Sequence, residues 1–204
     1  MTTFTEQFLT DTRAVLEHLD HRAIESVVDI VAATRERGGR LFLCGSGGGA
    51  GHASHAACDF RKLCDVESYA VADNVSELTA RINDDGWDSS YSNWLRASRL
   101  GPADCVFVFS VGGGDVDRRI SVNLVEAMQL ARERGAALVG VAGRDGGALA
   151  RLADACVVIP TVDPGLVTPQ AEGLQAVVWH LIVSHPTLAI GAAKWESISV
   201  PSAD

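Results

Sequence analysis

The 204-residue sequence has no long uninterrupted apolar run, no basic segment and no closely spaced cysteine pair. No window approaches the roughly 18 apolar residues of a membrane-spanning helix, so we expect no membrane association. The amino terminus also lacks the basic and apolar segments of a signal peptide. These absences predict a cytoplasmic protein.

Basic residues are in the minority, because 17 lysines and arginines stand against 26 aspartates and glutamates, for a net charge of -9. Nucleic-acid-binding proteins usually present a basic face to the phosphate backbone, so the balance argues against nucleic acid as a partner. The five cysteines are an odd number with no C-x-x-C pair, which favours reduced thiols.

Short apolar runs alternate with segments of helical spacing, and the length suits one domain. We expect strands at Arg40–Cys44, Tyr69–Ala72, Cys105–Ser110, Ala137–Ala142 and Cys156–Pro160. We expect helices at Thr5–Leu19, Arg22–Arg37, Ala50–Leu63, Val75–Ile82, Trp87–Arg99, Val116–Arg134, Gly147–Ala153 and Pro169–His185. The Val, Leu and Phe content of the strands is typical of a sheet covered on both faces, which predicts a doubly wound α/β fold.

The single domain divides into N-terminal helices within residues 1–37, an α/β core over 40–188 and a tail over 189–204 whose last residues we expect to be mobile. The first two helices have apolar faces but no strand of their own to cover. They should therefore pack on the sheet or on another subunit, which indicates a homo-oligomer.

Two glycine-rich loops, Gly45–Gly49 and Gly112–Gly114, each follow an apolar strand and precede an expected helix. Glycine lets the backbone approach a ligand closely, and free N–H groups at the start of a helix point at negative charge. A sugar phosphate is the simplest ligand for such loops. Asp115 should cap the helix that follows the second loop, where its charge would oppose a phosphate.

The helix after the first loop carries His55 and Asp59 at a spacing of four residues, on one face, with His52 one turn earlier. Such a pair can hold an ion, or it can be an ordinary solvent-facing pair. On the last helix, His180 has apolar neighbours and could equally be a packed core residue. Glu172 lies eight residues before it, about 12 Å along a straight helix and too far to share one ion.

Two further polar segments precede expected helices. Asn83 and Asp84 are expected in a turn between two helices, and the segment Gly143–Gly147 is expected to be a structural turn.

The order of these pieces resembles the sugar isomerase (SIS) domain family, and within it the phosphoheptose isomerases, which interconvert sedoheptulose 7-phosphate and D-glycero-D-manno-heptose 7-phosphate. The resemblance covers roughly Leu9 to Leu188. It implies a five-stranded parallel sheet, a homotetramer with sites at subunit contacts, and a bound divalent metal, zinc in many members.

By this resemblance, Asp59 and His180 would be the catalytic base and acid of an aldose–ketose isomerisation through an enediol. The implied metal ligands are His55, Asp59, Glu172 and His180. The implied substrate-binding residues are Ser46, Gly47, Gly48, Asn83, Asp84, Ser110, Gly112, Gly113, Gly114, Asp115 and Glu172. Asp59 stands where the family usually has glutamate, and Glu172 where it has glutamine.

The second loop departs most from the family, whose members carry a Ser-Thr-Ser-Gly-x-Ser pattern. Here only Ser110 keeps a hydroxyl, so phosphate would depend on backbone N–H groups and Ser46. Two alternatives follow: a non-catalytic SIS module that binds a sugar phosphate or a protein partner, or an isomerase of a different ketose phosphate.

Overall fold

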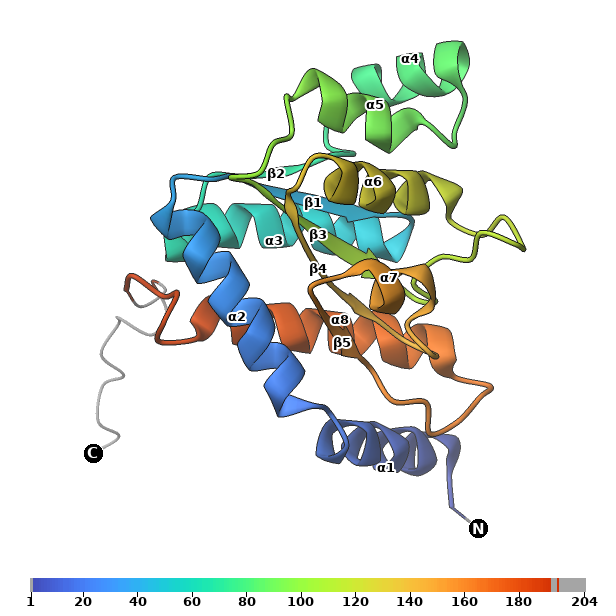
Figure 1. Cartoon of the computed structure of the whole chain (residues 1–204). Helices are drawn as coiled ribbons and strands as arrows, with labels where there is room; N and C mark the ends of the chain where they lie inside the picture. Colours follow the sequence, from blue (N-terminus) through green and yellow to red (C-terminus); the bar gives the residue numbers. More distant parts are fainter. Residues whose placement is uncertain (1, 192–193, 195–204) are drawn as a thin grey trace.

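The structure is a computed structural model that describes residues 2–191 and 194. Its centre is a parallel sheet of five strands in the order β2-β1-β3-β4-β5 (Figure 1). The strands are β1 Leu41–Gly45, β2 Ser68–Ala70, β3 Cys105–Ser110, β4 Ala137–Ala142 and β5 Ala155–Val158. The predicted doubly wound α/β fold is confirmed. The strand order reverses between β1 and β3, and in such folds ligands bind at the carboxyl edge beside that point.

Helices cover both faces of the sheet, as Figure 1 shows. They are α1 Phe4–Glu17, α2 His21–Glu36, α3 Gly48–Cys64, α4 Val75–Asp85, α5 Ser90–Ala97, α6 Val122–Glu133, α7 Gly147–Leu152 and α8 Val167–Ser184. Successive strand residues point to opposite faces. Leu43 and Phe107 accordingly pack with α2, α3 and α8, whereas Phe42 and Val106 pack with α5, α6 and α7.

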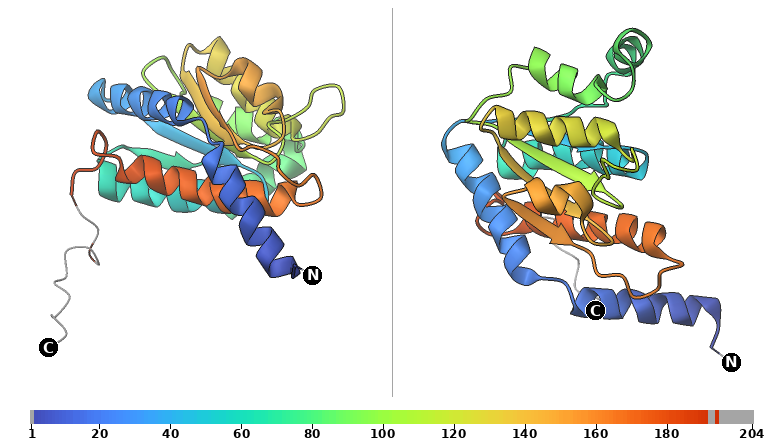
Figure 2. Two further views of the ribbon diagram at one scale, coloured as in Figure 1. Left: turned by 90° about the horizontal axis from the view of Figure 1, so that it is seen from below. Right: turned by 45° about the vertical axis from the view of Figure 1, so that its right-hand side comes forward.

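Helix α1 projects from the body of the molecule (Figures 1 and 2). A capping box between Thr3 and Glu6 starts it, and only Asp11 and Val15 are buried along its length. Phe4 and Leu9 are exposed. Helix α2 instead buries its apolar face on the sheet, so the two N-terminal helices have different environments.

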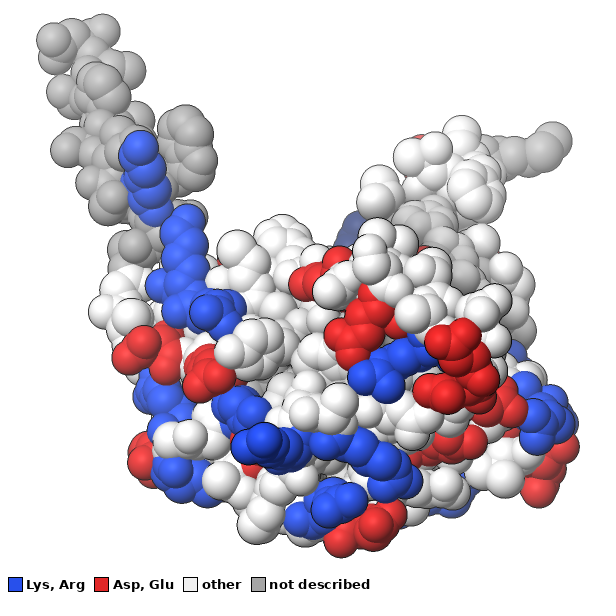
Figure 3. Space-filling view, turned by 90° about the horizontal axis from the view of Figure 1, so that it is seen from above, with Lys and Arg blue, Asp and Glu red and all other residues white. Residues whose placement is uncertain are grey.

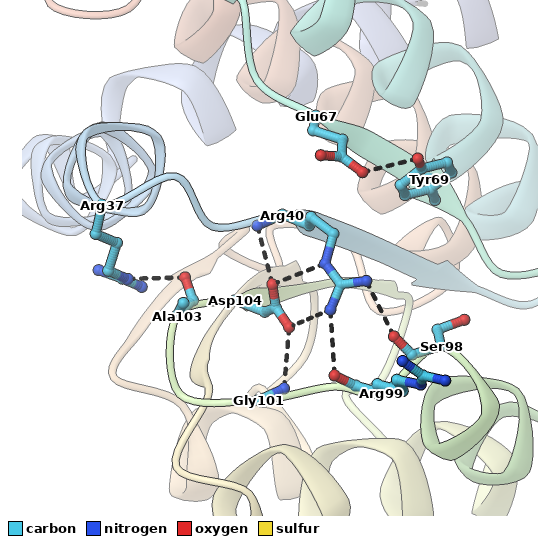
Figure 4. Close-up of polar contacts among 9 residues, drawn as sticks. All are labelled: Arg37, Arg40, Glu67, Tyr69, Ser98, Arg99, Gly101, Ala103 and Asp104. Atoms are coloured by element: carbon cyan, nitrogen blue, oxygen red, sulfur yellow. Dashed lines mark hydrogen bonds and ion pairs between the residues drawn. The ribbon is translucent and has the colours of Figure 1, made fainter.

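An ion pair anchors the amino-terminal edge of the sheet, opposite the ligand edge (Figure 4). Arg40 precedes β1, and its guanidinium lies 2.9 Å from the carboxylate of Asp104, which precedes β3. The same carboxylate accepts the backbone N–H groups of Arg40 and Gly101. The hydrogen bond that the Arg40 guanidinium donates to the Asp104 carboxylate raises the pKa of Arg40. It holds β1 and β3 in register where they begin.

Two predicted boundaries are wrong at residues of interest. Helix α6 begins at Val122, not Val116, so Asp115 does not cap it. Asp115 instead forms an antiparallel bridge with Ile120, in a short hairpin that precedes the helix. Asn83 and Asp84 are not in a turn but in the last turn of α4, because that helix continues to Asp85.

The structure describes only part of the predicted C-terminal tail. Of the tail predicted over 189–204, residues 192–193 and 195–204 lie outside the described residues. No helix in the described part of the chain is long and apolar enough to cross a membrane.

Candidate functional site

Helices α3 and α8 bring His55, Asp59 and His180 together. One ligand atom from each residue lies within 4.8 Å of the others. The His55 Nε2 and Asp59 Oδ2 atoms are 3.8 Å apart, and the His55 and His180 ring centroids are 5.5 Å apart. His180 is thus an exposed residue beside the helical pair and not a packed core residue. Its buried neighbour Trp179 occupies the core position.

A backbone hydrogen bond selects which nitrogen of His180 can bind a ligand. His180 Nδ1 lies 2.7 Å from the carbonyl oxygen of Ala176. A carbonyl can only accept, so Nδ1 carries the hydrogen and Nε2 of the neutral ring is left with a free lone pair. A hydrogen bond of this kind commonly orients metal-binding histidines.

The donor set of this cluster fits a divalent metal. Two imidazole nitrogens and one carboxylate oxygen, with further positions open, suit a zinc ion bound at about 2.0–2.2 Å. Ligand atoms on such an ion are about 3.3 Å apart, so the separations in the cluster need only small side-chain rotations. The cluster lies at the surface, with 60% of the His55 side chain and 17% of the Asp59 side chain exposed.

Glu172 is not part of this cluster. It lies within the regular α8 helix, two turns before His180, and its carboxylate approaches the start of α3, where a Cβ atom on Gly48 would be 2.6 Å away. It also lies beside His52, whose pKa is lowered mainly by burial. The geometry therefore does not support the predicted metal role of Glu172, because eight helical residues separate it from His180.

The first glycine loop joins β1 to α3 with the predicted strand-loop-helix geometry. Gly47 has a φ of 58°, and Gly45 lies so close to the helix that a Cβ atom would be 2.1 Å from the Gly49 carbonyl oxygen. The Ser46 hydroxyl accepts a hydrogen bond from the Asn123 side chain. Asn123 is fully buried and was not predicted from the sequence. Because the Ser46 oxygen accepts this hydrogen bond, the hydrogen of the Ser46 hydroxyl can still be donated to another partner.

The second glycine loop does not open a helix, contrary to expectation. Gly113 donates its N–H to the Ser110 hydroxyl. The carbonyl groups of Gly113 and Gly114 accept the N–H groups of Leu149 and Ala148 at the start of α7. The loop therefore satisfies the amino terminus of a neighbouring helix with its own carbonyl groups and presents fewer free N–H groups than predicted.

A cleft of about 540 Å³ opens at the carboxyl edge beside β1, β3 and β4. It is lined by Ser46 and Ser110, as expected, and also by Arg118, Arg144 and Arg151. The sequence alone did not point to these arginines. A signal was available for Arg144, which lies two residues after the end of β4, a strand whose end pairs with the end of β3.

Some of the predicted residues line the cleft, some form the cluster and others belong to neither region. Ser46, Ser110, Gly112, Gly114 and Asp115 line the cleft. His55, Asp59 and His180 are not among the cleft-lining residues, and they lie further along α3 and α8. Asn83 and Asp84 line neither region among the described residues.

Comparison with known proteins identifies the family. The family profile of the SIS domain matches residues 7–143, more than half of the chain. The chain belongs to the SIS domain family. A phosphoheptose isomerase from Rhodospirillum rubrum is 31% identical over 165 residues, covering 78% of this chain and 82% of that protein.

Two more proteins are similar to this SIS domain. A lincomycin biosynthesis protein from Streptomyces lincolnensis is 36% identical over 188 residues; the match covers 87% of this chain but 66% of that protein's length. The solved phosphoheptose isomerase of Neisseria gonorrhoeae superposes with a TM-score of 0.73 at 24% identity, covering 86% of this chain and 91% of that one. The latter match shows the shared fold.

Proposed function

We propose that this SIS domain is an aldose–ketose isomerase of a phosphorylated sugar, and that its substrate is sedoheptulose 7-phosphate. The observation that carries the proposal is the cluster of His55, Asp59 and His180 in a chain 31% identical to a phosphoheptose isomerase. The cleft beside the first glycine loop supports a phosphate-bearing substrate.

Asp59 is the proposed base that moves a proton between carbon 1 and carbon 2 of the sugar. One carboxylate oxygen lies 3.8 Å from His55, so the other can face the substrate. His180 has a single free nitrogen, because Nδ1 is bonded to Ala176. The ligand role and the acid role proposed for His180 therefore compete for Nε2. We assign it the ligand role.

The proposed cofactor is one divalent ion per chain, zinc being the best fit to two imidazoles and a carboxylate. When bound, such an ion stabilises negative charge that develops on the sugar oxygens. His55, Asp59 and His180 would hold it, and the surface position of the cluster leaves open positions for the substrate.

A second subunit would complete this site. The metal cluster and the cleft are separate in one chain, and Val177 and Leu181 expose apolar side chains on α8 beside His180. Exclusion of water from the reacting atoms requires a cover over this face. We propose a homotetramer in which another copy supplies it, while the cytoplasmic location stays a prediction.

The metal site is tested by elemental analysis of the purified protein. We expect about one divalent ion per chain in the wild type and a loss of at least tenfold in occupancy in His55→Ala. His52→Ala is the matched control, because His52 lies one turn earlier on the same helix but outside the cluster, and it should keep its metal. Equal occupancy in His55→Ala and the wild type would contradict the proposed ligand set.

The reaction is tested by incorporation of solvent deuterium into sedoheptulose 7-phosphate. Removal of a general base typically costs a factor of about 10² to 10⁴ in rate, so Asp59→Asn should lose exchange by at least 100-fold. Binding of the sugar phosphate by the wild type without any exchange would favour the non-catalytic alternative.

A further inference from the structure

The cleft at the carboxyl edge is lined by three arginines as well as by three serines. Arg118, Arg144 and Arg151 line it, whereas Ser46, Ser110 and Ser121 are its hydroxyl residues. Carboxylates are present too, because Asp115 and Asp145 also line the cleft. The charged side chains of the cleft therefore sum to +1, in a chain whose net charge is -9.

Both carboxylates of the cleft contact groups two or three residues further along the chain. Asp115 accepts the backbone N–H of Arg118, and its second oxygen lies 3.7 Å from the Arg118 guanidinium. Asp145 accepts the backbone N–H of Gly147. Neither carboxylate forms an ion pair with Arg144 or Arg151.

The side chains of Arg144 and Arg151 differ in this respect from most charged groups of the molecule. In the described part of the chain, neither makes a hydrogen bond or an ion pair, although the protein has more acidic than basic residues. On the face shown in Figure 3, by contrast, many lysines and arginines lie beside carboxylates. Two unpaired guanidinium groups directed at one cleft indicate an anionic ligand.

The backbone places Arg144 over the second glycine loop. Gly143 donates its N–H to the Val111 carbonyl group, so the segments that follow β3 and β4 leave the sheet side by side. The Arg144 side chain contacts the open side of Gly112, where a Cβ atom would be 3.5 Å from Arg144 Cδ. Arg144 itself has a φ of 55°, a backbone conformation that residues with a side chain rarely adopt.

Part of the second glycine loop is committed to contacts within the protein. Its Gly113 N–H is bonded to Ser110, and its carbonyl groups at Gly113 and Gly114 face α7. A phosphate in this cleft can gain further donors from the arginines, because a guanidinium donates two parallel hydrogen bonds to phosphate oxygens.

We infer that Arg144 and Arg151 bind the phosphate group of the substrate in this cleft, with Ser46 as an additional donor. The inference rests on the proposed function, because it names the residues that hold the substrate's phosphate. In this chain charged donors take the role that hydroxyl groups of the second loop have in the resembling isomerases. Binding should therefore depend more strongly on salt concentration than binding by neutral donors does.

The test is calorimetric titration with inorganic phosphate and with sedoheptulose 7-phosphate. Arg144→Gln and Arg151→Gln should each lower the affinity for both ligands about tenfold, because each variant loses a charge-assisted hydrogen bond. The double variant should have a still lower affinity. Arg144→Lys keeps the positive charge but lacks the planar guanidinium group, so its affinity for phosphate should lie between those of the wild type and Arg144→Gln. Unphosphorylated sedoheptulose should bind equally to all variants.

Arg99→Gln is the matched control. Arg99 is also an exposed arginine with a positive φ of 55°, but it lies at the amino-terminal edge of the sheet, outside the cleft. It should bind phosphate like the wild type. Wild-type affinity of the Arg144→Gln/Arg151→Gln double variant for inorganic phosphate would overturn the inference.

Two outcomes distinguish a failure of the isomerase proposal from a failure of the proposed role of the arginines. Deuterium exchange with an unchanged KM in the double variant would support the isomerase and refute the role of the arginines. Arginine-dependent phosphate binding by a wild-type protein that shows no exchange would support the role of the arginines and refute the isomerase.

Discussion

The cysteines differ in exposure and in acidity, although all five are free thiols. Burial raises the pKa of Cys44, Cys105 and Cys156 to about 12, and that of Cys64 to about 11. Cys58 is exposed on α3. The thiolate is the reactive species, so at pH 8 the four other thiols are almost entirely in the unreactive form.

We therefore predict one fast-reacting thiol per native chain in a titration with a chromogenic disulfide at pH 8. Cys58→Ser should abolish the fast phase, and unfolding in guanidinium should release the remaining four thiols. Two or more fast thiols in the folded wild type would contradict the low reactivity expected of the other four cysteines.

At the scale of elements, the contact between the second glycine loop and α7 is a very close approach at the ligand edge. Gly113 has a φ of 73°, and a Cβ atom there would be 1.8 Å from the Gly146 carbonyl oxygen. Both the backbone conformation and the space exclude a side chain. The Arg144 segment is held in place by the same contact, so this loop positions the cleft even where it does not itself bind the ligand.

We predict that Gly113→Ala lowers the free energy of unfolding by more than about 2 kcal/mol, because the backbone must shift to admit the methyl group. Gly51→Ala is the control: Gly51 lies inside α3 with nothing within 4 Å of an added Cβ atom, and alanine should stabilise the helix by about 0.5–1 kcal/mol. Urea unfolding measures both. Equal stability of the two variants would refute the packing role of Gly113.

For the whole molecule, the surface left apolar by one chain bears on its assembly. Helix α1 projects from the body of the molecule (Figure 2). It exposes Phe4, Leu9 and Leu16, and α8 exposes Val177 and Leu181 near His180. Several apolar side chains on two separate helices are typical of surfaces that another chain covers.

We predict a tetramer in sedimentation equilibrium at micromolar concentration. Phe4→Ser combined with Leu9→Ser should shift the mass toward smaller species if α1 lies in a contact, whereas Val116→Ser, an equally exposed apolar residue in the hairpin before α6, should leave the mass unchanged. A monomeric wild type would contradict the tetramer and the composite site together.

The order of strands and helices and the pairing of His55 with Asp59 could both be predicted from the sequence, because both depend on local spacing along the chain. The sequence also located the first glycine loop at the end of a strand. These features need no knowledge of which distant segments touch.

Other features of the site depend on which distant segments pack together, and no local pattern predicts them. His180 joins His55 because α3 and α8 lie side by side, which no local pattern records, and the same helix geometry takes Glu172 away from the cluster. Asp115 bonds to Ile120 and not to a helix start. Arg144 reaches the cleft because β4 pairs with β3, a contact between segments about 30 residues apart whose partners only packing selects.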